Sequence, residues 1–367
     1  MLTKLVREMA RRRSDENKVI SLTDAGVYGE QIRALHVPVV CLGMARGKFP
    51  TWAQLVKLRR TIQEDAPDVV QTWLDHADVV GGLVAKWANR NIPVFWNVRH
   101  SNPGLCSKRF SRRLVAFLHR MLSKGLPDRI IVNSNRGLRA HVEVGYSKEK
   151  MVPIPNAFDT EVFRPDLHAG CVFRENIPNM SKDSIVLGMA ARYDPMKAHD
   201  FLLKAVKIVH GKQPNILLVL CGSGVTCENA VLGAQIRELN LEGNVALLGP
   251  QNSMSNFMNA LDYFVLSSRW GEGFPNVIGE AMACGKPCIS TDVGDAAEII
   301  GPSGWVVPPG DPESLAAAII DAIDEDDRLR VRRQRQCRQR IVERYRISDV
   351  ASEYLALWSC AIRKTAI

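Results

Sequence analysis

The most informative stretch of the sequence is Ser268-Arg-Trp-Gly-Glu-Gly-Phe-Pro-Asn-Val-Ile-Gly-Glu-Ala-Met-Ala-Cys-Gly285. It follows an apolar run that ends near Ser267, so we expect a buried strand to lead into this glycine-flanked loop. Pro275 stands where the first residue of a helix should be, because its fixed φ suits that place. A strand, a loop and a helix in this order are the building unit of a parallel sheet covered by helices.

The same alternation of short apolar runs and longer helical patterns extends through most of the chain, and it predicts an α/β fold. In the first half we expect strands over residues 19–22, 37–42, 68–72, 92–98 and 129–133. Between them, helices are expected near 50–65, 76–88, 108–124 and 135–144. In the second half the expected strands are 185–190, 216–221, 245–248, 263–266 and 287–290, and the chain should end in helices near 327–345 and 348–363.

The chain is long enough for two domains, with 367 residues of which 46% are apolar. The segment Pro153-Ile154-Pro155-Asn156 is a natural boundary between them. We therefore predict two doubly wound, Rossmann-like domains over residues 1–153 and 154–345, and a C-terminal helix over 346–367 that packs back on the first domain. Ligands of such sheets bind beyond the carboxyl ends of the strands, so the chemistry should lie in a cleft where the two sets of loops face each other.

Charge and composition exclude several classes of protein. Residues 1–165 hold 27 Lys and Arg against 15 Asp and Glu, whereas the remainder is slightly acidic. This asymmetry predicts an anionic partner for the first half, but no nucleic-acid-binding motif accompanies it. The nine cysteines show no CxxC spacing, and neither a signal peptide nor an apolar run of membrane-spanning length is evident. We expect a cytoplasmic protein.

The stretch 268–285 contains two carboxylates that could bind a ligand. Glu272 lies in the loop and Glu280 lies on the following helix, where both can face one cleft. Carboxylates accept hydrogen bonds from sugar hydroxyls, and helix-start amides near Asn276 and Val277 can bind a diphosphate. The alternative is that one glutamate favours the helix dipole and the other is only solvated.

A second group of polar residues follows the strand at 185–190, in Gly188-Met-Ala-Ala-Arg192-Tyr-Asp-Pro-Met-Lys197. Arg192 can bind phosphate through its planar guanidinium, and Lys197 adds a mobile positive charge. Together they could neutralise a leaving diphosphate without a metal ion. The alternative is a pair of surface cations beside a turn.

These two groups together resemble the family 4 glycosyltransferases, which share the GT-B fold. Glu272 and Glu280 match the E-x7-E signature of that family, and Arg192 and Lys197 match its diphosphate-binding pair. Pro155-Asn156 matches the start of the family's second domain, and Val307-Pro-Pro-Gly-Asp-Pro312 matches a later segment. The resemblance covers nearly the whole chain.

The resemblance implies roles for individual residues. Arg192 and Lys197 should hold the diphosphate, Glu280 the ribose, and Glu272 the donor sugar. Loops near Gly222-Ser-Gly224 and Leu248-Gly249 should border the base. The full set expected to bind the donor is Arg192, Lys197, Glu272, Gly273, Phe274, Pro275, Asn276, Val277 and Glu280.

The resemblance also implies two histidines in the first half. His100, in Trp96-Asn-Val-Arg-His100-Ser, fits the histidine presented to the sugar near the anomeric carbon, and a loop histidine without a role is the alternative. His76 either lines the acceptor side or is a packed histidine beside Asp75, which would cap the helix. The residues expected to be catalytic are thus His100, Glu272, Arg192 and Lys197.

The activity implied is retaining transfer of a sugar from a nucleotide diphosphate, commonly a UDP-sugar, to a lipid-linked or cell-surface glycan such as lipopolysaccharide or exopolysaccharide. No cofactor and no metal ion are expected, and Asp324-Glu325-Asp326 is interpreted as a solvated surface. A nucleotide-sugar epimerase of similar fold and an inactive truncated relative are the alternatives.

Two further expectations concern the first domain. In the helix near 108–124, Phe110, Leu114, Phe117, Leu118 and Met121 form an apolar stripe, which should either pack on a sheet or, with the cations beside it, dock on an anionic membrane surface. The sequence opens with the helical pattern of Leu2, Leu5, Val6 and Met9, where the family has a strand and a glycine-rich loop. We therefore expect the first, central strand of this domain to be missing and to be encoded upstream in frame; restoring it should raise the domain's melting temperature and activity.

Overall fold

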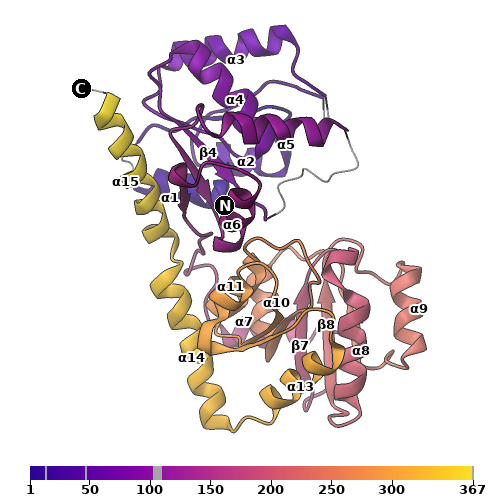
Figure 1. Cartoon of the computed structure of the whole chain (residues 1–367). Helices are drawn as coiled ribbons and strands as arrows, with labels where there is room; N and C mark the ends of the chain where they lie inside the picture. Colours follow the sequence, from indigo (N-terminus) through magenta and orange to yellow (C-terminus); the bar gives the residue numbers. More distant parts are fainter. Residues whose placement is uncertain (13–14, 46–47, 102–109, 366–367) are drawn as a thin grey trace. The chain divides into compact units, whose positions relative to one another are not determined.

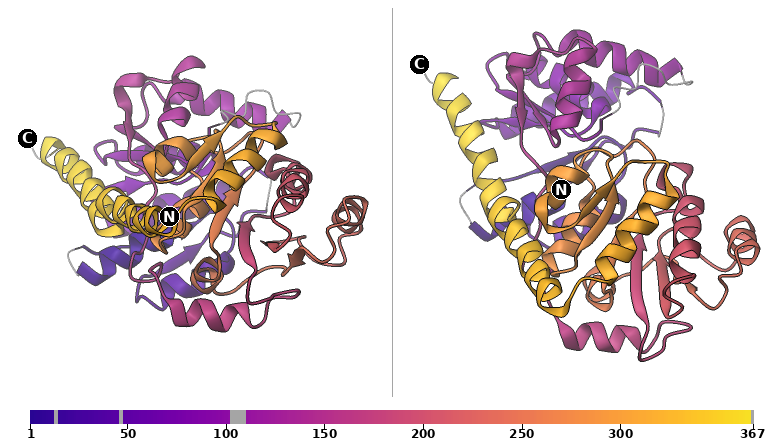
Figure 2. Two further views of the ribbon diagram at one scale, coloured as in Figure 1. Left: turned by 90° about the horizontal axis from the view of Figure 1, so that it is seen from below. Right: turned by 60° about the horizontal axis from the view of Figure 1, so that its bottom comes forward.

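The computed structural model describes residues 1–12, 15–45, 48–101 and 110–365, which fold into two compact units (Figures 1 and 2). Unit 1 comprises Met1–Ala157 and Ile347–Ile367, and unit 2 comprises Phe158–Arg346. The chain leaves unit 1 after Ala157 rather than at residue 153, because Ile154 and Ala157 are buried in a core of unit 1.

Unit 2 is a parallel six-stranded sheet with the strand order β12-β11-β10-β7-β8-β9. Buried apolar side chains of the strands contribute to two cores that also contain residues of the surrounding helices. Its strands are β7 (Ile185–Ala190), β8 (Ile216–Cys221), β9 (Val245–Leu247), β10 (Tyr263–Leu266), β11 (Cys288–Thr291) and β12 (Trp305–Val307). Its helices are α7 (Leu167–Arg174), α8 (His199–His210), α9 (Ala230–Glu238), α10 (Met254–Ala260), α11 (Asn276–Ala283), α12 (Ala296–Ile300), α13 (Pro312–Ile323) and α14 (Asp327–Arg344), with short 3-10 turns at Pro195–Lys197 and Gly301–Ser303.

The order of these strands reverses between β7 and β10. The chain runs from β7 outward to β8 and β9, and then returns so that β10 pairs with the other edge of β7. In an open α/β sheet such a reversal separates the loops beyond the neighbouring strand ends and leaves room for a ligand. The loops after β7 and β10, which carry the residues singled out in the sequence, therefore lie at the favoured position.

Unit 1 contains two parallel sheets, β1-β2 and β3-β4-β5-β6. Its strands are β1 (Val19–Ser21), β2 (Val39–Cys41), β3 (Val70–Gln71), β4 (Val94–Val98), β5 (Arg129–Val132) and β6 (Met151–Pro153). Its helices are α1 (Leu2–Arg12), α2 (Gly26–Arg33), α3 (Trp52–Asp65), α4 (Asp75–Ala88), α5 (Phe110–Leu122), α6 (Asn135–Glu143) and α15 (Ile347–Thr365), with a 3-10 turn at Lys148–Lys150.

Within the described residues, the two sheets of unit 1 are not paired with each other. They nevertheless share a core, because Ile20 and Leu42 pack with Val94 and Trp96 of β4.

The C-terminal helix α15 completes a second core of unit 1. Its Val350, Ala351 and Tyr354 are buried with Leu5 and Met9 of α1. The Tyr354 hydroxyl also accepts a hydrogen bond of 2.8 Å from Asn97 Nδ2 in β4.

Helix α5 does not pack the whole of its predicted apolar stripe on the sheet, which was the first of the two orientations expected for it. Phe117 and Met121 of the predicted apolar stripe are exposed, whereas His119 and Ser123 are buried. The reason is that buried polar partners hold His119, whose Nε2 lies 3.0 Å from Asp78 Oδ2. The prediction that Phe117 and Met121 pack on the sheet is thus wrong. The side chain of Phe110 lies outside the described residues.

The segment Asp324-Glu325-Asp326, interpreted as a solvated surface, is only partly so. Asp326 caps α14 by accepting from the amides of Arg328 and Leu329, whereas the Glu325 side chain is largely buried in an ion pair with Arg333. Eight cysteines in the described ranges are unpaired. No helix among these residues is long and apolar enough to cross a membrane.

Candidate active site

In the loop after β7, Arg192 precedes a short 3-10 turn, Pro195–Lys197, and Lys197 is the last residue of that turn. Asp194 caps this turn, because its carboxylate accepts a hydrogen bond of 2.9 Å from the Met196 amide. That bond, with help from Arg192, lowers the pKa of Asp194. Arg192 is largely exposed and its Nε lies 3.1 Å from Asp194 Oδ2, so its guanidinium is held near the surface of the loop.

Lys197 points instead into the neighbouring loop after β10. Its Nζ forms an ion pair with Glu272 Oε1, and both side chains are largely buried. The Ser268 hydroxyl donates a second hydrogen bond of 2.6 Å to the same carboxylate oxygen. Lys197 and Glu272, which are 75 residues apart, are thus held together. The predicted set did not include Ser268, whose position at the end of the strand is the signal that could have found it.

Backbone contacts connect the loop after β7 with the loop after β10. The Arg269 amide donates to Met196 O at 2.8 Å, and Gly271 has a φ of 81° with so little space that a Cβ there would lie 2.5 Å from Met196 Sδ. On the other side, the Asp295 amide donates to Gly273 O at 2.9 Å. Glycine at 271 is therefore favoured by its positive φ, whereas the close neighbour Met196 Sδ is the movable end of a side chain.

Helix α11 begins directly after this loop. Asn276 is its first residue and Pro275 is its N-cap, one position earlier than the place predicted for the proline. Phe274 is buried against Phe158 and Tyr345, with ring centroids 6.2 and 5.6 Å away, so its side chain fixes the loop in the core. Because of that packing, only the backbone of Phe274 is suited to meet a ligand.

The rest of the predicted donor site comprises residues of α11 and the loops that follow β8 and β9. Glu280 lies on α11 and is partly exposed, as is Val277. The loops after β8 and β9 are joined by a hydrogen bond of 2.9 Å from the Gly222 amide to Gly249 O, and the Tyr193 amide donates to Ser223 O at 2.8 Å. These contacts fix the segments predicted to border the base against the loop that carries Arg192.

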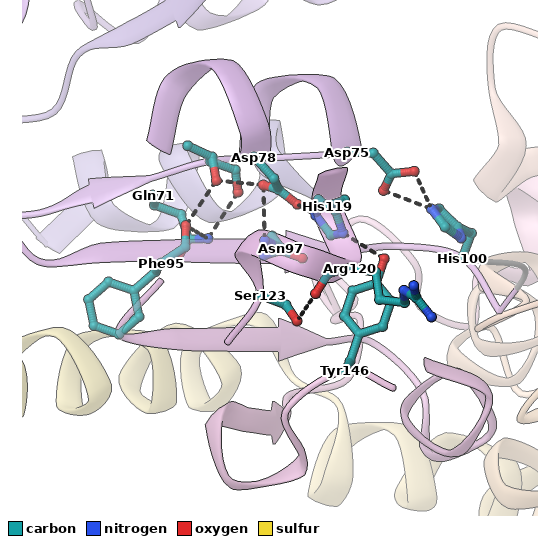
Figure 3. Close-up of polar contacts among 11 residues, drawn as sticks. Gln71, Asp75, Asp78, Phe95, Asn97, His100, His119, Arg120, Ser123 and Tyr146 are labelled. Atoms are coloured by element: carbon teal, nitrogen blue, oxygen red, sulfur yellow. Dashed lines mark hydrogen bonds and ion pairs between the residues drawn. The ribbon is translucent and has the colours of Figure 1, made fainter. Parts of the chain in front are cut away.

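In unit 1 the predicted residue His100 is paired with Asp75 (Figure 3). His100 Nε2 lies 3.0 and 3.2 Å from the two carboxylate oxygens of Asp75. Burial alone would raise the pKa of Asp75, but the hydrogen bond and charge of His100 lower it to about 2. Asp75 was predicted as a possible helix cap, yet it is the first residue of α4 and no side chain caps that helix. His76 is exposed and not packed.

The backbone just before Asp75 is strained. Leu74 has a φ of 75° and a ψ of 153°, a region that residues with a Cβ rarely adopt. Such strain clusters at functional sites, where the surrounding structure holds it in place. Here the Leu74 amide donates to Asn97 O at 3.2 Å, and the next residue is Asp75.

A buried hydrogen-bonded network lies beside this pair (Figure 3). Asp78 accepts from the Thr72 hydroxyl at 2.5 Å and contacts His119, whose Nδ1 lies 2.8 Å from the Tyr146 hydroxyl. Burial raises the pKa of Asp78 despite His119 and lowers that of the nearby His141 to about 4. Asp75, Asp78 and His119 could bring ligand atoms within 4.8 Å of one another, but Asp78 and His119 already satisfy each other. We interpret the network as the support of the His100 loop.

Comparison with known proteins follows the same division of the chain. Residues 1–162 match the model for Glycosyltransferase Family 4, and residues 173–340 match that for Glycosyl transferases group 1. The chain is 26% identical over 87% of its length to 81% of the UDP-Gal:alpha-D-GlcNAc-diphosphoundecaprenol alpha-1,3-galactosyltransferase of Escherichia coli. It is 24% identical over 86% of its length to 83% of the capsular polysaccharide biosynthesis glycosyltransferase CapM of Staphylococcus aureus.

Solved structures share the fold. Anabaena HepE in complex with UDP and glucose superposes with a TM-score of 0.81 at 23% identity, covering 97% of this chain and 95% of HepE. The sucrose-phosphate synthase of Thermosynechococcus elongatus has a TM-score of 0.76 at 19% identity, with 98% and 92% covered. Both comparisons support the two-unit, parallel α/β architecture.

Proposed function

Because this chain belongs to the family 4 glycosyltransferases of the GT-B fold, we propose that it transfers a sugar, with retention of configuration, from a UDP-sugar to a lipid-linked or glycan acceptor in polysaccharide biosynthesis. The observation that carries the proposal is the pairing of Lys197 with Glu272 at the point where the strand order of unit 2 reverses. Relatives named as a lipid-linked galactosyltransferase and a capsule glycosyltransferase support the substrate classes.

The proposed reaction uses the two loops in different ways. Lys197 and Arg192 bind the diphosphate, and Glu272 accepts hydrogen bonds from sugar hydroxyls while Lys197 and Ser268 hold it in place. Glu280 on α11 binds the ribose, and the backbone N–H groups of Gly273, Phe274, Asn276 and Val277 complete the donor site. No carboxylate is assigned as a nucleophile.

Bond changes in this mechanism balance without a cofactor. The bond from the anomeric carbon to the phosphate oxygen breaks, and its electron pair leaves with the diphosphate. The acceptor hydroxyl attacks the same face of the sugar, and its proton passes to the leaving phosphate. Fixed cations stabilise the charge that develops on the diphosphate, which is the most effective place for them.

A screen of UDP-, GDP- and ADP-sugars, with and without extracted lipid-linked acceptors, tests the proposal. We expect release of the nucleoside diphosphate from one class of donor, faster when the acceptor is present. Absence of turnover with every donor and acceptor would contradict it.

Transfer is expected to continue in EDTA, because two side-chain cations, Arg192 and Lys197, are proposed to neutralise the diphosphate. The measurement is the initial rate of transfer before and after chelation, with Mg²⁺ or Mn²⁺ added back as the control. A strict requirement for either ion would show that the cations do not suffice.

Asp75→Asn is expected to lower the rate of transfer by about 10- to 100-fold, because His100 would lose the carboxylate that orients it. Affinity for free UDP should be unchanged, since the proposed nucleotide site lies in unit 2. The matched control is Asp65→Asn, which removes an exposed carboxylate of unit 1 paired only with Lys18 among the described residues. If the Asp75→Asn variant transferred sugar at the wild-type rate, Asp75 and its pairing with His100 would have no role in the reaction.

A further inference from the structure

Three adjacent helices of unit 1 expose large apolar side chains. Helix α3 packs against α4, and α4 packs against α5, so the three form one layer (Figure 1). The exposed residues are Trp52 at 70%, Leu83 at 46%, Trp87 at 41%, Phe117 at 46% and Met121 at 51%. We call the side of this layer that bears them the outer face.

The spacing of exposed and buried residues shows that each helix has one outward stripe. On α5, Arg113, Phe117 and Met121 recur every four residues and are all exposed, and Lys124 is exposed in the turn that follows the helix. On α4, Leu83 and Trp87 are exposed, whereas the neighbouring Val84 and Ala85 are buried in the core. The apolar residues therefore belong to the outer face and do not contribute to the core.

The two tryptophans connect the outer stripes of α3 and α4. Their ring centroids are 5.4 Å apart, and the guanidinium of Arg59 lies 4.6 Å from the centroid of the Trp87 ring. A hollow of about 620 Å³ beside α3 is lined by Trp52, Lys57 and Arg60 among others. Aromatic surface and positive charge thus meet in one place.

Cations surround the apolar residues of the outer face. Lys57, Arg60, Arg90, Arg113 and Lys124 are exposed, and none forms an ion pair within the part of the chain that the structure describes. Glu64 is an acidic residue beside the hollow. The outer face is therefore apolar and positively charged at once.

We propose that this outer face docks on the surface of an anionic phospholipid bilayer, an interaction that is separate from glycosyl transfer. Tryptophan favours the level of the lipid headgroups, and lysine and arginine are attracted to anionic lipids around it. A nucleic acid would use the cations but leave Leu83, Phe117 and Met121 in water. The anionic cytoplasmic leaflet is the surface that fits, which makes the protein peripheral to the inner face of the membrane.

Flotation of the full chain with phosphatidylglycerol-containing vesicles tests the proposal. The wild-type chain should bind them, and binding should weaken from about 0.05 to 0.5 M salt as screening shortens the range of the charges. Lys57→Glu/Arg60→Glu should lower vesicle affinity by about 25-fold or more, because each basic residue at an anionic surface contributes roughly a factor of 5 and the introduced glutamates are repelled in addition. Trp52→Ala/Trp87→Ala should lower it even in low salt.

The matched control is Arg328→Glu/Arg332→Glu, which makes the same change of charge at exposed positions of α14 in unit 2. It should bind vesicles as the wild-type chain does, and thermal unfolding should show that all variants are folded. Equal loss of binding in the α14 variant would show that net charge alone attracts the protein. Binding to phosphatidylcholine vesicles alone, or to DNA in preference to vesicles, would overturn the proposal.

Discussion

Lys197→Ala is expected to lower the rate of sugar transfer by about 100-fold or more, since a charged hydrogen bond contributes roughly 1.5–3 kcal/mol and more where charge develops in a transition state. Lys197 is largely buried and its one acidic partner among the described residues is Glu272. Removing it therefore leaves the leaving diphosphate without its least hydrated cation. Arg192→Ala should act in the same direction.

The loss has to be separated from damage to the fold, because Glu272 would keep only the hydrogen bond from Ser268 among the contacts described above. Thermal unfolding of the variant reports that damage. The control is Lys204→Ala, which removes an exposed lysine of α8, the helix that follows the loop carrying Lys197. This variant should keep wild-type activity. A folded Lys197→Ala protein with wild-type transfer rates would contradict the assignment of the diphosphate site.

The two glutamates should respond differently to loss of charge. Glu280→Gln is expected to weaken binding of free UDP by about 10-fold, as for a lost charged hydrogen bond, because its proposed partner is the ribose. Glu272→Gln should leave UDP affinity nearly unchanged and lower the rate of transfer by about 100-fold, because its proposed partner is the sugar. Titration calorimetry with UDP and initial rates of transfer measure the two effects.

Each glutamate variant serves as the control for the other. The substitution is isosteric in both, and the two residues lie eight positions apart on one loop-helix segment. Equal loss of UDP affinity in both variants would refute the division of roles between them. The structure favours a division, because Glu272 is held by Lys197 and Ser268 whereas Glu280 lies on α11.

The strands of unit 2 were the most predictable part of the fold. The apolar runs at 185–190, 216–221 and 263–266 coincide with β7, β8 and β10, because a central parallel strand is buried on both faces and reads as a continuous apolar run. Strands β6 and β12 were missed. Each has three residues and precedes a proline or includes one, so neither gives a recognisable pattern.

Contacts between distant residues could not be predicted in the same way. The sequence predicted an apolar stripe on α5 that would pack on the sheet, but it could not show that His119 would be buried instead, where it contacts Asp78. Similarly, Asp75 at a helix start suggested a cap, and only the fold brings His100 within 3.0 Å of it. Lys197 and Glu272 were singled out from their positions in loops after strands and then matched to the family's motifs, whereas their ion pair depends on how the two loops fold together.

We propose that the chain breaks the bond between the sugar and the diphosphate of its donor and joins the sugar to an acceptor with the same anomeric configuration. The direct measurement is a time course by NMR of the donor, the nucleoside diphosphate and the glycoside formed. We expect UDP to appear in step with a product whose anomeric configuration is that of the donor. A donor converted to its epimer without release of UDP, a product of inverted configuration, or a donor left unchanged beside a suitable acceptor would contradict it.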